Sequence, residues 1–431
     1  MHDKSAEVNI IEIPHFFRVR QLFDRHCVAD VRASSHLAIK QSGLGSRVQP
    51  GQSVAVTVGS RGISNIAQIT KSVVEAILAM GAIPFIVPAM GSHGGATAQG
   101  QRQVVHELGI TQESMGCEIR SSMDTVEIGK SNEGFPIYFD RHAFEADHVV
   151  VVNRIKPHTR FSGPVESGLM KMMLIGLGKH AGALVYHRVI QNYSFDQIVR
   201  SVAREVIGRC RIAAGIAILE NAYEETARIV GIAASEIESI EPQLLNEVRR
   251  ILPKLPFDHA ELLIVDEIGK NISGAGMDTN VIGRKLNDRA AINGEVPRIH
   301  HIYVRSLSKQ TQGNASGIGI AEMCHDRVLG QIDMVKTRIN SITASHISAA
   351  AMPVSFSNDR QAIETAVRMG GWGDARNYPA MWISNTLRLD EVACSEIYYR
   401  AAQENKSLEI LTSPEPLVWT GTGDLQQCRP L

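Results

Sequence analysis

The chain has 431 residues, more than one hydrophobic core usually absorbs, so we expect two domains. Hydrophobic residues make up 44% of the chain and charged residues 21%, which is ordinary for a globular protein. The formal net charge of -1 provides no basic field for a phosphate backbone, which argues against a nucleic-acid partner.

The sequence also gives no sign of membrane insertion or secretion. No apolar run approaches the roughly 18 residues that a membrane-spanning helix needs. The start, MHDKSAEVNIIEI, lacks a signal-peptide core, so we expect a cytoplasmic protein. The 6 cysteines form no Cys-x-x-Cys pair, which argues against a zinc ribbon, an iron–sulfur cluster or a disulfide framework.

From residue 53 onward, strand and helix patterns alternate. Residues 53–58 (SVAVTV) read as a buried strand, and Asn65 is placed to begin a helix with Gln68 completing a capping box. Residues 83–90 predict the next strand, and Thr97 is placed to cap a helix that ends near residue 109. This order is typical of a parallel sheet covered by helices.

The same pattern continues to the end of the chain. Further strands are predicted at 147–153, 212–220, 261–265, 301–305 and 380–384, and further helices at 166–176, 180–190, 194–207, 234–254, 333–345, 359–369 and 391–405.

Two prolines at 253 and 256 mark the expected domain boundary. We therefore predict an α/β protein of two domains, 1–255 and 256–404, each with a parallel-type sheet flanked by helices. The active site is expected in the cleft between them. The last stretch, 405–431, is expected to return to the first domain.

Ligands of such sheets collect at the carboxyl ends of the strands, so the loops found there are the candidate sites. Arg61 follows the first strand, where its planar guanidinium suits a carboxylate; the alternative is a surface ion pair. His93 follows the second strand, flanked by Gly94 and Gly95, which let a backbone approach a ligand closely. His93 is a candidate general base, against the alternative of a solvated loop residue.

The segment NRIKPHTRFSGPVESGLMK, residues 153–171, is the strongest signal. It brings a strand into a loop dense in basic residues, with Pro157 fixing the backbone before His158. Lys171 lies among apolar residues, which favours a nucleophile or attachment point; otherwise its stem simply covers apolar surface. His187 follows, where a helical histidine is more often a packed residue than a ligand.

In their order along the chain, these residues resemble the nickel-dependent lactate racemase family over roughly the N-terminal two-thirds. The resemblance implies a nickel-pincer nucleotide, pyridinium-3,5-bisthiocarboxylic acid mononucleotide, tethered to Lys171 with His187 as nickel ligand. It implies that His93 and His158 are the paired acid and base and that Arg61 binds the substrate carboxylate. The phosphate of the nucleotide would be met by the 91–97 loop or by Lys179 and His180.

The chemistry so implied is racemisation of a 2-hydroxy acid by reversible hydride transfer. One histidine takes the hydroxyl proton, the cofactor takes the hydride, and the second histidine serves the opposite face of the planar keto acid. Enzymes that mature the cofactor would be partners, and a homo-oligomer is compatible with the sequence. In the second domain, Lys270 on the loop after strand 261–265 is expected to meet substrate, or else to be a solvated charge.

Three positions depart from the family pattern. Val58 stands where the family has an aspartate, the interval from His158 to Lys171 is about three residues longer, and the loop Gly-Ser-His-Gly lacks an arginine after its histidine. We therefore expect a hydroxy acid other than lactate, or an epimerisation of a sugar acid. Two alternatives stay open: a metal-dependent hydrolase or lyase using His93, His158 and His187, and a non-catalytic nucleotide-binding protein.

Overall fold

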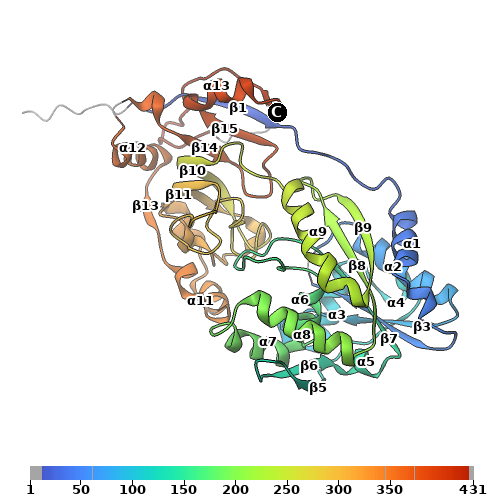
Figure 1. Ribbon diagram of the computed structural model, residues 1–431. Coiled ribbons are helices and arrows are strands. Elements are labelled where there is room, and N and C mark those ends of the chain that lie inside the picture. The colour runs from blue at the N-terminus through green and yellow to red at the C-terminus, as the bar shows by residue number, and fades with distance from the viewer. Residues whose placement is uncertain (1–11, 61, 345, 373, 427–431) are drawn as a thin grey trace, which may run out of the picture. The chain divides into compact units, whose positions relative to one another are not determined.

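The computed structural model describes residues 12–426 except 61, 345 and 373. The chain divides into two compact units. One is formed by Asp24–Leu252, and the other combines the chain from Pro253 onward with the segment that ends at Phe23. Each unit is an α/β sandwich around its own sheet, as the alternating sequence pattern predicts (Figure 1).

The sheet of the N-terminal unit has the strand order β4-β3-β2-β7-β8-β9. Its parallel strands are β2 (Ser53–Val58), β3 (Ile83–Pro88), β4 (Glu118–Ile119), β7 (His148–Arg154) and β8 (Ile212–Glu220), while β9 (Thr226–Ala233) runs antiparallel to β8. The chain runs outward from β2 to β4 and then returns to the other side of β2 as β7. The topological switch point therefore lies between β2 and β7.

Helices cover both faces of this sheet because its strands alternate between two buried faces. One face packs against α1 (Val31–Gln41), α2 (Ile66–Ala79), α3 (Ala98–Glu107) and α4 (Gln112–Met115). The other packs against α6 (Leu169–Lys171), the π-helix η3 (Met172–Gly176), α7 (Lys179–Val189), α8 (Phe195–Arg209) and α9 (Ile237–Ile251). α5 (Arg141–Glu145) and the hairpin of β5 (Thr125–Lys130) and β6 (Pro136–Asp140) pack against the same hydrophobic core. Figure 1 shows α1 and α9 on opposite sides of β8 and β9.

The predicted helix after Asn65 is present, but the predicted capping box is wrong. Asn65 adopts a left-handed conformation with φ 59° and makes no side-chain cap. Its amide instead donates to Thr226 Oγ1 at 2.9 Å, so a tertiary partner has replaced the local one. The cap predicted at Thr97 is confirmed, since its hydroxyl accepts from Gly100 N at 3.1 Å.

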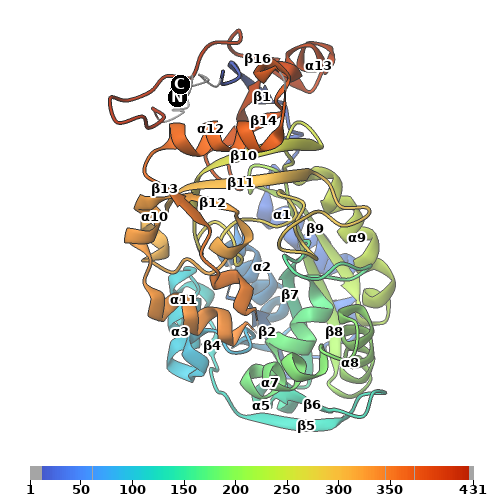
Figure 2. The ribbon, with the colours of Figure 1, turned by 90° about the vertical axis from the view of Figure 1, so that its left-hand side faces the viewer.

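The sheet of the C-terminal unit has the order β13-β12-β11-β10-β14-β15-β1-β16. Five strands are parallel: β10 (His259–Ile268), β11 (Arg298–Leu307), β12 (Met323–His325), β13 (Val354–Phe356) and β14 (Ala380–Ile383). β15 (Glu391–Ser395), β1 (Phe16–Gln21) and β16 (Leu408–Ile410) extend it in antiparallel fashion. α12 (Asp359–Gly370) covers one face and α10 (Asp326–Gln331) the other, as Figure 2 shows. α13 (Tyr399–Glu404) packs into the same hydrophobic core as α10. α11 (Met334–Thr343) follows α10.

Two expectations about the end of the chain are wrong. The helix predicted over 391–405 is a strand, β15, followed by the short α13. The stretch from 405 does not return to the N-terminal unit: β16 pairs with β1, and both belong to the C-terminal unit. The physical reason is a long-range antiparallel pairing of β1 with β15, which carries residues 16–21 out of the domain that their position in the chain suggests.

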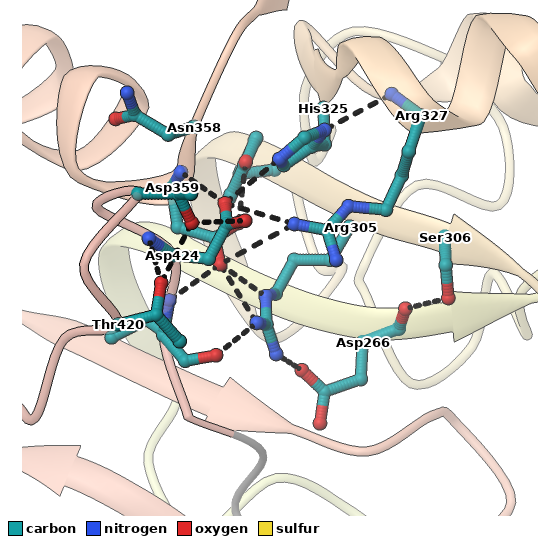
Figure 3. A network of polar contacts seen from close by, with 12 residues as sticks. Asp266, Arg305, Ser306, His325, Arg327, Asn358, Asp359, Thr420 and Asp424 are labelled. Atoms are coloured by element: carbon teal, nitrogen blue, oxygen red, sulfur yellow. Dashed lines mark hydrogen bonds and ion pairs between the residues drawn. The ribbon is translucent and has the colours of Figure 1, made fainter.

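The last described residues are held to the C-terminal unit by a buried ion-pair network (Figure 3). Asp359 accepts from Tyr303 Oη at 2.7 Å, Arg305 Nη2 at 2.7 Å and Leu425 N at 2.8 Å. Asp424 pairs with His325 Nε2 and with Arg327 Nη2, each at 2.9 Å. Among the residues described here, no helix is long and apolar enough to cross a membrane.

Candidate functional site

The candidate site lies at the carboxyl edge of the N-terminal sheet, where the loops after β2, β3 and β7 meet. A Cβ placed on Gly59, directly after β2, would lie 3.2 Å from Met172 Cε on η3 and 3.9 Å from Asn153 Oδ1 on β7. Asn153 Nδ2 donates to Gly168 O at 2.8 Å, and Gly91 N donates to Gly176 O at 3.3 Å. These contacts tie the three loops and η3 into one surface beside the switch point, where ligands of such sheets bind.

His93 lies on this edge, exposed to solvent, in the loop after β3. Its Nδ1 is hydrogen-bonded to Ser60 Oγ, which joins the second loop to the first. From beneath, Gln101 Nε2 donates to Gly91 O at 2.8 Å and to His93 O at 3.3 Å. The backbone that carries the imidazole is thus anchored by a buried amide.

The two glycines after His93 have different surroundings. Gly94 has φ +67°, and a Cβ there would lie 2.6 Å from Gln101 N, so packing alone requires glycine. Gly95 has φ +66°, and a Cβ there would meet nothing within 4 Å. The backbone at Gly95 is therefore the part of this loop that another molecule can approach.

Lys179, expected to meet a nucleotide phosphate, is wholly buried. Its Nζ donates to Pro88 O and to Gln101 Oε1 at 3.1 Å, and it pairs with Asp140 at 3.1 Å. Burial lowers the pKa of the lysine, and Asp140 opposes that shift. With its three donor positions directed at protein oxygens, this ammonium supports the His93 loop from inside and does not serve a ligand.

His158 is presented by a loop that closes on itself. Lys156 and Ser167 form a bridge of two backbone hydrogen bonds, at 2.9 and 3.1 Å. Inside the loop, the buried carboxylate of Glu166 accepts from His158 N at 2.6 Å and from Arg249 Nη2 at 2.6 Å. Arg249 also donates to Gly163 O at 2.7 Å, so α9 holds the loop in place.

The imidazole of His158 is fixed on one nitrogen and one face. Arg160 N donates to His158 Nδ1 at 3.0 Å, and the ring stacks on Phe161 with centroids 4.1 Å apart. Because Nδ1 accepts a backbone N–H, the proton of the neutral ring is placed on Nε2.

Lys171 ends α6 and leads directly into η3, a π-helix of the kind often found at functional sites. The apolar surroundings expected from the sequence are present: Leu169, Met170, Met172, Met173 and Leu174 are all buried. Lys171 itself is half-buried.

His187 lies exposed on α7, yet partial burial of its ring lowers its pKa. A chain of aromatic rings joins its surroundings to those of His158. The ring of Tyr186 is 5.4 Å from that of His187 and 6.1 Å from that of Phe161, which stacks on His158. The elements carrying these two histidines therefore pack together.

The structure does not place either proposed substrate ligand within this group. Arg61 lies outside the described residues. Lys270 belongs to the C-terminal unit, on the loop after β10, where its Nζ donates to Gly274 O at 2.6 Å. That loop begins beside β14, on the other side of β10 from β11, so it too lies at a topological switch point.

The three histidines do not form a shared metal site. Over the described residues, the one group of three ligating side chains with atoms within 4.8 Å of one another is His325, Asp359 and Asp424. Arg305 and Arg327 already neutralise those carboxylates, so a further cation gains little there. The hydrolase hypothesis, which needs His93, His158 and His187 around one ion, lacks this geometry.

Several residues that shape the site were not singled out from the sequence. Ser60 and Glu166 lie within segments that drew attention, but a side-chain partner cannot be assigned from sequence position alone. The partners on distant segments, which are Gln101, Asp140, Phe195, Glu241 and Arg249, gave no local signal.

Comparisons with known proteins identify a similar domain and a similar fold. The family model described as lactate racemase N-terminal domain matches residues 25–196. Among solved structures, the lactate racemase apoprotein from Thermoanaerobacterium thermosaccharolyticum is similar, with a TM-score of 0.50 and 12% identity over 82% of this chain and 95% of that one. A structural-genomics protein from Thermotoga maritima gives a TM-score of 0.46 and 13% identity over 74% of this chain and 81% of that one. Curated protein sequences give no match.

The matched segment contains the loops of Ser60, His93 and His158 together with Lys171 and His187. The structural likeness, at 12% identity, extends the shared fold into the C-terminal unit. Residues 25–196 thus match the lactate racemase N-terminal domain, and the fold of the chain is similar to that of a solved lactate racemase.

Proposed function

We propose that this protein is a racemase or epimerase of a 2-hydroxy acid that works with a nickel-pincer nucleotide. The observation that carries the proposal is the common edge of the N-terminal sheet. On it, the loop of His93 is hydrogen-bonded to the π-helix that follows Lys171, and the loop of His158 leads into the turn that carries Lys171. Phe161, which stacks on His158, packs against Tyr186 of α7, the helix that bears His187.

The residues of this edge fit such a cofactor. Lys171 is half-buried among apolar side chains, which suits an amine that is joined covalently to a ring. The lowered pKa of His187 favours the neutral imidazole that a metal ligand requires. The open backbone at Gly95 can meet a phosphate or another polar group. When bound, the cofactor supplies reversible acceptance of a hydride from carbon.

The two histidines divide the proton transfers between them. Ser60 Oγ can accept the Nδ1 hydrogen of His93, which leaves Nε2 able to take a proton from the substrate hydroxyl. His158, whose Nδ1 already accepts from Arg160 N, holds its proton on Nε2 and can return it to an oxygen. In this state His93 is placed to act as base and His158 as acid. The opposite enantiomer uses them in reverse, starting from the protonated His93 and the deprotonated His158 Nε2 that the first direction leaves.

For the substrate, we propose only a chemical class. Arg61 is proposed to bind its carboxylate, and Lys270 is proposed to contact the substrate. Val58 is buried where the family pattern has an aspartate, and the histidine loop lacks the arginine of that pattern. We therefore propose a hydroxy acid other than lactate.

The test begins with protein purified from its native host. Intact mass and peptide mapping should show an adduct on the peptide that bears Lys171, with stoichiometric nickel. A panel of single-enantiomer 2-hydroxy acids and sugar acids should then reveal loss of optical purity for at least one member.

The H93A and H158A variants should each lose most of this activity while retaining the adduct. H106A, which changes an exposed histidine on α3, should keep it. Loaded protein that is inactive on every member of the panel would contradict the proposed function, and so would H93A and H158A variants with unchanged activity.

A further inference from the structure

The carboxyl group of Glu241 is buried against the turn that carries Lys171. Glu241 lies on α9, is 1% exposed, and its Oε2 accepts from Met170 N at 2.9 Å. Oε1 has no hydrogen-bond partner, and a Cβ on Gly168 would overlap it. The glycine thus makes room for the carboxyl group at the start of α6.

The beginning of α6 has no other side-chain cap. Gly168, the residue before it, is extended and offers no side chain to the free N–H groups of the first turn. Glu241, on α9, takes the place of that cap by accepting from the backbone N–H of Met170, the residue before Lys171. The next residues are locked by packing, because a Cβ on Gly215 of β8 would lie 2.6 Å from Leu169 Cδ1.

We propose that Glu241 is a positioning residue for Lys171, holding the turn from which the lysine side chain leaves the helix. This role rests on the proposed function, since Lys171 matters as the attachment point there. The cofactor does not touch Glu241 in this proposal. Its effect on the reaction passes through the backbone of residues 169–171.

Because Glu241 can ionise, this role can be tested by changing the pH. Burial raises its pKa to about 7, against the smaller effects of the Met170 and Leu169 N–H groups and of Arg200. The sign follows from linkage: a raised pKa means that the folded turn is most stable with Glu241 neutral, and that stability is lost as pH rises through about 7. A hydrated, ionised carboxylate favours opening of the turn.

Other charged groups on the elements around Glu241 have partners of their own. Arg200 on α8 pairs with Glu238 at 3.2 Å, Arg228 on β9 pairs with Glu247 at 2.8 Å, and Arg249 pairs with Glu166 at 2.6 Å. Glu220, at the end of β8, pairs with Arg154, and Lys171 itself lies on the same turn. The change near neutral pH is therefore attributed to Glu241.

Amide hydrogen exchange on the apoprotein tests the proposal without any need for activity. After correction for intrinsic exchange, protection of the 169–172 amides should fall about tenfold between pH 6 and pH 8 in the wild type, because over this range the carboxyl group of the folded turn loses its proton while that of the opened turn is already ionised. E241Q keeps an acceptor for Met170 N and should show little such fall. E241A should show low protection at both pH values.

The control variant is E236Q, which changes an exposed glutamate just before α9 and should behave as wild type. Amides of β8 serve as the internal reference. If E241A loses amide protection equally in β8 and in 169–172, Glu241 acts only as a core residue and the proposal is overturned. Wild-type protection of 169–172 that does not change with pH would also overturn it. The wild-type series decides the matter even if both Glu241 variants fail to fold.

Covalent loading gives the second measurement. In a host that makes the cofactor, E241A should carry several-fold less adduct on Lys171 than wild type, and E241Q should be closer to wild type. Absence of any adduct on wild-type Lys171 would contradict the proposed function, but it would not affect the result of the hydrogen-exchange experiment. Normal loading of E241A would overturn the positioning role alone.

Discussion

Lys179 shows how a basic residue in a promising segment can serve the fold instead of a ligand. Its ammonium and the carboxylate of Asp140 are both fully buried, 3.1 Å apart. Removing one member of such a pair leaves an uncompensated charge, which typically costs about 3–5 kcal/mol.

We therefore expect K179M to lower the free energy of unfolding by about that amount in urea titrations. The double variant K179M/D140N should lose less than the sum of the two single variants, because neither charge remains. K40M, at an exposed position on α1, is the control. An unchanged midpoint for K179M would mean that the pair carries no net stability.

Ser60 tests whether the orientation of His93 matters. S60A removes the hydroxyl group that bonds to His93 Nδ1, and a hydrogen bond of this kind contributes about 1 kcal/mol. We expect kcat to fall about fivefold with little change in Tm. S46A removes an exposed hydroxyl that donates to Gly43 O at 2.8 Å, outside the candidate site, and should leave kcat nearly unchanged. Equal effects of the two variants would indicate a general disturbance of the loops.

At the scale of elements, the local sequence pattern predicted those strands whose formation depends on neighbouring residues. The strands 53–58 and 212–220 were predicted with the bounds they have, because each is an apolar, β-branched or small-residue run between turns. The pattern could not separate β15 from the short helix after it, since the two follow one another within 391–405. The left-handed conformation of Asn65 could not be predicted from the sequence either, because its hydrogen-bond partner Thr226 is distant in sequence.

For the site, the sequence indicated the candidate side chains but not the elements that hold them. His93, His158, Lys171 and His187 were marked by loop position, neighbouring prolines and glycines, and their order. Arg249 and Glu241 project from α9, some seventy or more residues beyond the segments they support. Only the packing of α9 against α6 and the 155–168 loop gives them a role.

The loop that carries His158 should depend on Arg249. R249M leaves the buried Glu166 without its cation and frees Gly163 O, so we expect faster amide exchange across residues 156–168 and a lower kcat. R250M, at the exposed neighbouring position, is the matched control. If exchange in this loop is the same in both variants, the ion pair does not restrain it.

At the scale of the whole molecule, the division into units differs from the order of the chain. Residues 16–21 form a strand of the C-terminal sheet between β15 and β16, so the chain starts in one unit, passes through the other and returns. Nothing in a short strand of mixed apolar and basic residues identifies a partner some 375 residues away.

The ion-pair network at the end of the chain should stabilise the C-terminal unit alone. Although burial acts to raise the pKa of Asp424, its hydrogen bond to His325 and the charge of Arg327 hold that pKa below its usual value. A depressed pKa stabilises the fold above the unfolded value of about 3.9, and this contribution is lost as pH falls below it.

D424N should therefore lower the thermal midpoint of the C-terminal unit by a few degrees at pH 7, with a smaller difference from wild type near pH 3. The contacts of Asp424, with His325, Arg327 and the backbone of Asp359, all lie within that unit. Hydrogen exchange in β8 should consequently stay at the wild-type level, and Q426A, at an exposed neighbouring position, should change neither unit. Loss of protection in β8 on D424N would show that the two units unfold as one, and that the network contributes to the stability of the whole chain.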